Sequence, residues 1–197
     1  MQEAFVGNWT QESHLSAEIL DSLRDLNHRF LDLTATRSAD WVAGRVAPLS
    51  AAQRAAAAGC PYALFDLRFQ DDGYWCSRLQ TPGSWRVADE FVADDETVNF
   101  VRLALFYAWH VASSAGLKAQ LVLGMNGGTA AAFRRITVNR LPALVATEAV
   151  HLSARWSGCT AYWSALTAAA SSADAAALRR VQLYGLQLAA AARLSNP

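Results

Sequence analysis

The stretch LSAEILDSLRDLNHRFLDL, residues 15–33, carries the clearest structural signal of the chain. Its large apolar side chains recur at alternating steps of four and three residues, which is the spacing of one face of an α-helix. This stripe consists of Leu15, Ile19, Leu23, Leu26, Phe30 and Leu33. Ser13 or Ser16 can cap the start of the helix. We therefore predict an amphipathic helix here, with the stripe facing a core.

Further helix signals lie on the carboxyl-terminal side of this stretch. Ser50 and Gln53 have the spacing of a capping box, and Gly59 predicts a left-handed end to the short Ala-rich helix that follows. The acidic cluster Asp94–Glu96 suits a helix amino terminus, because the unpaired amides and the helix dipole favour negative charge there. Shorter helices are predicted at residues 117–123, after a cap at Thr129, near 140–145 and through 162–166, and a long one from about 175 to 194.

Two segments alternate apolar and polar residues, which is typical of extended chain with one buried face. They are Phe65–Phe69 and Val150–Trp156. A polar linker with Pro82-Gly83 marks the boundary between two halves, 1–90 and 91–197. The predicted fold is mainly α: a helical bundle-like domain with short extended segments.

The order of capped helix, alternating segment and aromatic helix occurs twice. Residues 49–79 align with residues 136–166 without gaps at an offset of 87 residues. The identical pairs are Ala56 and Ala143, Arg68 and Arg155, Ser77 and Ser164, and Leu79 and Leu166. Two interpretations stay open: a duplication that makes the chain a pseudo-dimer of related halves, or a match produced by Ala-rich composition.

Composition and charge exclude several classes of protein. The 197 residues are 53% hydrophobic, which is ample for a buried core. Seventeen basic and seventeen acidic residues cancel, so contact with nucleic acid is expected to be local. Three cysteines without a CxxC pair argue against a disulfide framework or a zinc finger and fit a reducing cytoplasm. The apolar stretch 98–111 is shorter than the roughly 20 residues of a membrane span, and the first ten residues lack the pattern of a secretory signal.

A series of segments in the second half follows the order seen in one known family. They are the apolar helix Leu103–His110, the turn Leu123–Asn126, the segments Ile136–Val138 and Leu144–Thr147, the pair Arg155-Trp156, and the closing helix Leu178–Leu194. Together, residues 99–194 resemble the D subunit of the bacterial flagellar master transcription regulator. The resemblance implies a helical fold that dimerises and binds a partner subunit and promoter DNA through a helix-turn-helix-like part, without enzymatic activity. The extra first half departs from this pattern, and in a fused pseudo-dimer the pairing surface would be used internally.

Candidate functional residues are arginines and tryptophans. For DNA contact, the candidates are Arg134, Arg135, Arg140, Arg155, Arg179 and Arg180. For a partner interface, they are the loop and tail residues Trp9, Trp41 and Trp85, whereas Trp75, Trp156 and Trp163 are expected in the core. The four histidines lack the spacing of a helical metal site, and we expect no catalytic residues, metal or cofactor.

We therefore predict a noncatalytic, transcription-regulator-like protein that contacts a regulatory subunit or a second copy, and DNA only within a complex. Two alternatives compete: an adaptor without nucleic-acid binding, and a helical small-molecule binder or enzyme with a Trp-lined pocket. A contiguous arginine surface favours the first function, an exposed apolar patch the second, and a pocket with convergent polar groups the third.

Overall fold

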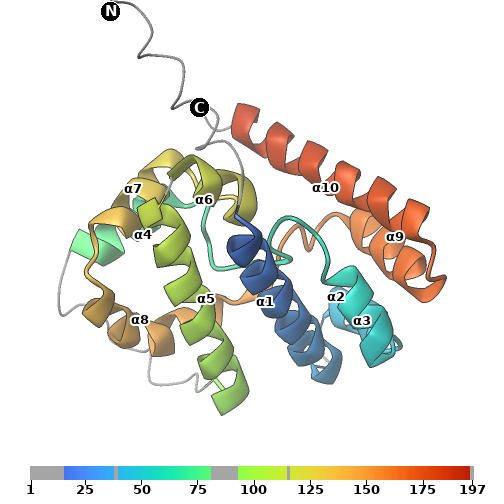
Figure 1. The fold of residues 1–197 in the computed structure, drawn as a ribbon. Coiled ribbons are helices and arrows are strands. Elements are labelled where there is room, and N and C mark those ends of the chain that lie inside the picture. The colour runs from blue at the N-terminus through green and yellow to red at the C-terminus, as the bar shows by residue number, and fades with distance from the viewer. Residues whose placement is uncertain (1–15, 38–39, 81–92, 115, 196–197) are drawn as a thin grey trace, which may run out of the picture.

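The computed structural model describes residues 16–37, 40–80, 93–114 and 116–195. These residues form ten α-helices, two short 3-10 helices and one antiparallel pair of two-residue strands (Figure 1). In chain order the elements are α1 (Ala17–Thr36), α2 (Trp41–Val46), α3 (Ala51–Ala57), β1 (Phe65–Asp66), α4 (Asp72–Gln80), α5 (Asp95–Ser114), α6 (Gly116–Leu123), α7 (Gly127–Arg135), η1 (Val138–Arg140), α8 (Leu141–Glu148), η2 (Ala149–His151), β2 (Ser153–Ala154), α9 (Thr160–Ser171) and α10 (Ala175–Ser195). The predicted mainly α-helical fold is confirmed. None of the described helices is long and apolar enough to cross a membrane.

The helix predicted from residues 15–33 is α1. The Ser16 hydroxyl caps it by accepting a hydrogen bond from the backbone nitrogen of Ile19 at 3.4 Å. The stripe residues within α1 are buried, and so is Asn27, which the stripe does not include. The Asn27 amide donates to the Tyr62 carbonyl at 2.9 Å and accepts from the Leu64 nitrogen at 2.9 Å. A polar side chain on the apolar face therefore joins α1 to the segment that leads into β1.

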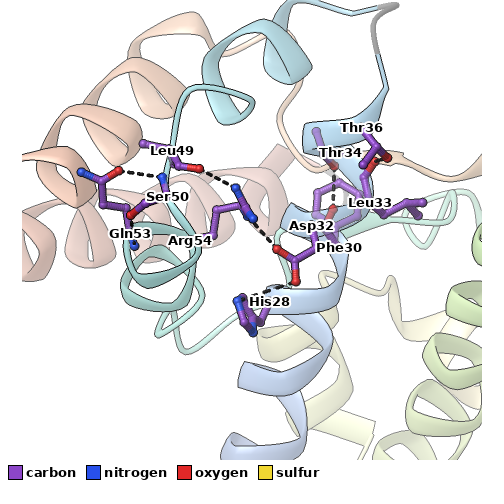
Figure 2. Close-up of polar contacts among 10 residues, drawn as sticks. All are labelled: His28, Phe30, Asp32, Leu33, Thr34, Thr36, Leu49, Ser50, Gln53 and Arg54. Atoms are coloured by element: carbon purple, nitrogen blue, oxygen red, sulfur yellow. Dashed lines mark hydrogen bonds and ion pairs between the residues drawn. The ribbon is translucent and has the colours of Figure 1, made fainter.

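A network of polar contacts holds α3 against α1 (Figure 2). The predicted capping box is confirmed: the Ser50 hydroxyl accepts from the Gln53 nitrogen, and the Gln53 side chain accepts from the Ser50 nitrogen. In the same helix, Arg54 donates to the Leu49 carbonyl and pairs with the Asp32 carboxylate of α1, with Nε and Oδ1 2.6 Å apart. One arginine thus ties the start of α3 to α1.

Helices of the two halves pack on each other. α1 and α5 lie side by side at the centre of the molecule (Figure 1). α4, from the first half, packs on α7, whereas α9, from the second half, packs on α2 and α3. β1 pairs with β2, so that Phe65 lies opposite Ala154 and Asp66 opposite Ser153. One continuous apolar core therefore contains residues of both halves.

A pair of tryptophans makes the same hydrogen bond in each half. The Trp75 indole donates to the carbonyl of Leu67 at 3.1 Å, and the Trp163 indole donates to the carbonyl of Arg155 at 2.9 Å. The two tryptophan donors are 88 residues apart, and so are the two carbonyl acceptors, whereas the sequence alignment uses an offset of 87. The two hydrogen bonds therefore match at a spacing one residue longer than the offset of the sequence alignment.

Other features recur at the same spacing of 88 residues. α4 begins at Asp72 and α9 at Thr160. Arg68 and Trp156 both have positive φ, of 57° and 54°. At this spacing, Phe65 of β1 corresponds to Ser153 of β2, and Asp66 corresponds to Ala154. The antiparallel register pairs them crosswise, Phe65 with Ala154 and Asp66 with Ser153. A local twofold arrangement of the two strands follows from this register.

Three local predictions differ from the structure. Gly59 is not left-handed, because α3 ends in a right-handed turn in which the Gly59 nitrogen donates to the Ala56 carbonyl. Thr129 does not cap a helix, because α7 begins two residues earlier and Asn126 occupies the cap position. The extended segments are only two residues long, because a residue with positive φ turns the chain soon after each strand.

Candidate functional site

The candidate DNA-contacting site is built on α6, a three-residue turn and α7. α6 ends at Leu123, Gly124 has a φ of 74°, and α7 begins at Gly127. The left-handed backbone at Gly124 lets the chain change direction within three residues. Two packed helices joined by such a short, Gly-containing turn have the connectivity of a helix-turn-helix unit. The Asn126 side chain anchors this turn to the first half by donating to the Gln70 carbonyl.

Three of the six candidate arginines gather at the carboxyl-terminal end of this unit. Arg134 and Arg135 are exposed at the end of α7. Arg140 lies in η1, and its guanidinium donates to the Leu79 carbonyl at 3.4 Å. Arg135 and Arg140 line the same hollow, of about 220 Å³. We call Arg134, Arg135 and Arg140 the arginine cluster.

α4 covers part of α7. A Cβ at Gly128 would lie 2.9 Å from a carboxylate oxygen of Asp72, so α4 lies directly on the α7 backbone. Thr129, Ala130 and Phe133 are buried in the same helix. Helix-turn-helix proteins read bases with the amino-terminal residues of the second helix. Here those residues are small or covered, and the arginine cluster is suited to contacts with phosphates.

The other candidate arginines lie elsewhere. Arg179 and Arg180 are exposed on the first turns of α10, and Arg180 pairs with Asp174 at 3.8 Å. α10 packs on α9, and its amino-terminal end lies away from α7 in Figure 1. Arg155 is only 4% exposed. Its assignment as a DNA-contact residue is wrong, because its guanidinium lies beneath the surface, where a phosphate backbone cannot reach it. The alternating pattern misplaced Arg155 because the strand ends at Ala154.

One of the candidate interface tryptophans lies within the described residues. Trp41 begins α2 and is 40% exposed, with the Arg45 guanidinium 5.2 Å from its ring centroid. Trp9 and Trp85 lie outside the described residues. Of the three tryptophans expected in the core, Trp75 and Trp163 are fully buried and Trp156 is partly buried. A role for Trp41 at an interface stays a prediction.

Sequence reasoning missed a buried acidic centre at the end of α8. Glu148 has no exposed surface, and its carboxylate accepts from the Tyr74 hydroxyl at 2.8 and 2.9 Å and from Arg78 Nε at 3.1 Å. Burial and this carboxylate together raise the pKa of Tyr74. The contact between Tyr74 and Glu148 has a counterpart: Tyr162 lies 88 residues after Tyr74, and Cys60 lies 88 residues before Glu148. The Tyr162 hydroxyl lies 3.9 Å from the Cys60 thiol. Because Tyr74 and Arg78 belong to α4, the centre fixes α4 on α8.

Cys60 is the most buried of the three cysteines. Burial raises the pKa of the Cys60 thiol to about 11, against the hydrogen bonds of Tyr62 and Tyr162. A thiol that stays protonated is a poor nucleophile. Within the described ranges, no three histidine, cysteine, aspartate or glutamate side chains are grouped so as to hold a metal ion.

Comparisons of the chain with protein families, with characterised proteins and with solved structures found no match.

Proposed function

We propose that this protein is a noncatalytic regulator, similar to the D subunit of the flagellar transcription regulator, that acts through protein contacts and touches DNA within a complex. The observation that supports this proposal is the α6–turn–α7 unit, with Gly124 left-handed in its turn and the arginine cluster at its end. Cations at a helix carboxyl terminus are also stabilised by the helix dipole, so the cluster is compatible with the fold.

The proposed contact is with phosphates rather than bases. Phosphate contacts position a protein on DNA but carry no sequence information directly. Since α4 covers the part of α7 that would read bases, sequence preference would come from a partner protein. This division of roles explains how a chain without net charge can take part in DNA binding.

We also propose that the chain is a fused pseudo-dimer. The matching tryptophan hydrogen bonds, helix starts and strand register at 88 residues support a duplication. In such a chain, α4 packs on the second half as α9 packs on the first. The surface that would join two subunits is then used within one chain, which weakens the tendency to form homodimers.

The DNA contact is tested by fluorescence anisotropy with a short labelled duplex of arbitrary sequence, titrated with the full chain over a series of salt concentrations. Two phosphate contacts, from Arg134 and Arg135, predict weak binding at low salt, with a log–log slope of roughly −2. The double variant Arg134→Ser/Arg135→Ser should reduce the magnitude of this slope by about 2.

The matched control is Arg179→Ser/Arg180→Ser, which removes two consecutive exposed arginines from α10 and causes the same change in net charge. It should bind the duplex like the unaltered protein. Equal losses in both double variants would mean that only overall charge matters. No binding at low salt would remove DNA from the proposal and leave the adaptor function.

A further inference from the structure

A polar cavity of about 270 Å³ lies beside the two strands, away from the arginine cluster. Its floor contains buried residues, Leu123, Ala154 and Arg155, and its exposed rim contains Gln70, Ser153, Ser157 and Gly158. Asp66, Gly124 and the partly buried Trp156 complete the walls. This volume has room for several water molecules or for one small molecule.

Arg155 places a nearly unexposed cation in this cavity. One of its terminal nitrogens donates to the carbonyl of Val122 at 3.1 Å, and the guanidinium lies 4.4 Å from the ring centroid of Trp156. A guanidinium has five N–H donors, and this carbonyl uses one of them. A buried charge is costly unless it is paired with an opposite charge or well hydrogen-bonded. Arg155 is thus left with donors for a further acceptor.

Gly124 is fitted to this arginine. A Cβ at Gly124 would lie 2.4 Å from one Arg155 nitrogen and 2.8 Å from its Cζ, so a side chain there would displace the guanidinium. The positive φ of Gly124 independently disfavours other residues. The backbone therefore reserves space for the Arg155 guanidinium at the cavity wall.

Asp66 also lines this cavity. It accepts from the backbone nitrogen of Phe69 at 3.2 Å and forms no ion pair with Arg155 within 4.0 Å. Burial lowers the pKa of Arg155 to about 10 and raises the pKa of Asp66. The opposite charge of each group partly offsets the effect of burial on the pKa of the other. The opposite charges are therefore near each other but separated, as a ligand that carries both charges would require.

We propose that this cavity binds a small zwitterion, a free α-amino acid, whose carboxylate accepts from Arg155 and whose ammonium group donates to Asp66. A carboxylate matches the planar donors of a guanidinium. The exposed residues Ser153 and Ser157 and the partly buried Trp156 line the same cavity. The site lies outside the arginine cluster, so it stands independently of the proposed DNA contact and would make the regulator responsive to a metabolite.

The test is isothermal titration calorimetry of the full chain with glycine, L-alanine and L-serine. Propionate, which lacks the ammonium group, and ethylamine, which lacks the carboxylate, are the comparison probes. We expect L-alanine to bind at least about tenfold more tightly than either, because each analogue leaves one charged group of the site without an oppositely charged partner. Thermal unfolding in the presence of L-alanine should show a matching rise in Tm.

Substitutions test the roles of Asp66 and Arg155 one at a time. Asp66→Asn keeps the side-chain shape and should abolish the preference for L-alanine over propionate, whereas Asp21→Asn changes an exposed carboxylate of α1 and should leave binding unchanged. Arg155→Lys should weaken both carboxylate probes; if it fails to fold, the Asp66 comparison decides. The proposal is overturned if L-alanine gives no binding heat, if propionate binds as tightly, or if Asp66→Asn keeps the preference.

Discussion

At Gly124 and at Gly185, a neighbouring side chain fills the space that a Cβ would need. Gly124 lies against the guanidinium of Arg155, as described above. Gly185 lies in the middle of α10, where a Cβ would come within 2.0 Å of the Tyr62 hydroxyl oxygen. The same hydroxyl donates to the carbonyl of Val181, also in α10, at 3.4 Å. Tyr62 therefore holds α10 on the molecule, and Gly185 gives it room.

The Gly185→Ala variant tests this contact. In an unobstructed helix, alanine is favoured over glycine by about 1 kcal/mol. The collision with Tyr62 should reverse the sign, and we expect a loss of about 1–3 kcal/mol in the free energy of unfolding, measured by urea denaturation. Gly158→Ala is the control, because nothing lies within 4 Å of its Cβ position, and it should be neutral or slightly stabilising. A Gly185→Ala protein as stable as the control would contradict the Tyr62 packing.

At the scale of single elements, α5 shows how an acidic sequence cluster becomes a cap that joins two helices. Asp94 accepts from the backbone nitrogen of Thr97 at 2.7 Å and from its hydroxyl at 2.8 Å. Arg37, at the end of α1, donates to the same hydroxyl at 2.6 Å. The hydrogen bonds from Thr97 hold the pKa of Asp94 below its ordinary value of 3.8. The start of α5 is thus joined to the end of α1.

Asp94→Ala should lower the free energy of unfolding by about 1 kcal/mol at neutral pH, the usual effect of losing a helix cap. A lowered native pKa means that the carboxylate stabilises the fold above its ordinary pKa and loses this effect as pH falls through the native pKa. The difference between the unaltered and Asp94→Ala proteins should therefore shrink below about pH 4. Asp95→Ala, a change in the exposed neighbour, should show a smaller difference at neutral pH. A pH-independent difference would exclude the carboxylate as the source of the stabilisation.

At the scale of the whole molecule, the boundary near residue 90 divides the sequence but not the core. α4 leaves the first half to pack on α7, and α9 leaves the second half to pack on α2 and α3. The β1–β2 pair also joins one strand from each half. Each half separated from the other would expose the apolar surface that these contacts bury.

Residues 1–90 and 91–197, produced separately, should therefore lack cooperative thermal unfolding, because neither half buries enough apolar surface alone. Mixing the two halves should restore helical circular dichroism and a cooperative transition. The intact chain under the same conditions is the control. A separate second half with native-like cooperative unfolding would show that the shared core is dispensable.

The sequence by itself determined most of the helices, because helix spacing and caps depend on residues three or four positions apart. The stripe of α1, the capping box of α3 and the acidic start of α5 were all predictable for this reason. It also placed Arg134 and Arg135 in a short helix, which is α7. The spacing of 88 residues between the matching tryptophan hydrogen bonds was less accessible, since neighbouring offsets give similar numbers of identical pairs in an Ala-rich chain.

Only the tertiary structure decided which polar residues are buried and what they meet. Asn27, Glu148 and Arg155 lie in segments whose patterns do not distinguish them from surface residues, and their partners are more than 30 positions away in the chain. Burial of such groups depends on helices that come together from distant parts of the sequence. For that reason Arg155, one of six similar arginines in the sequence, became the floor of a cavity rather than part of a surface.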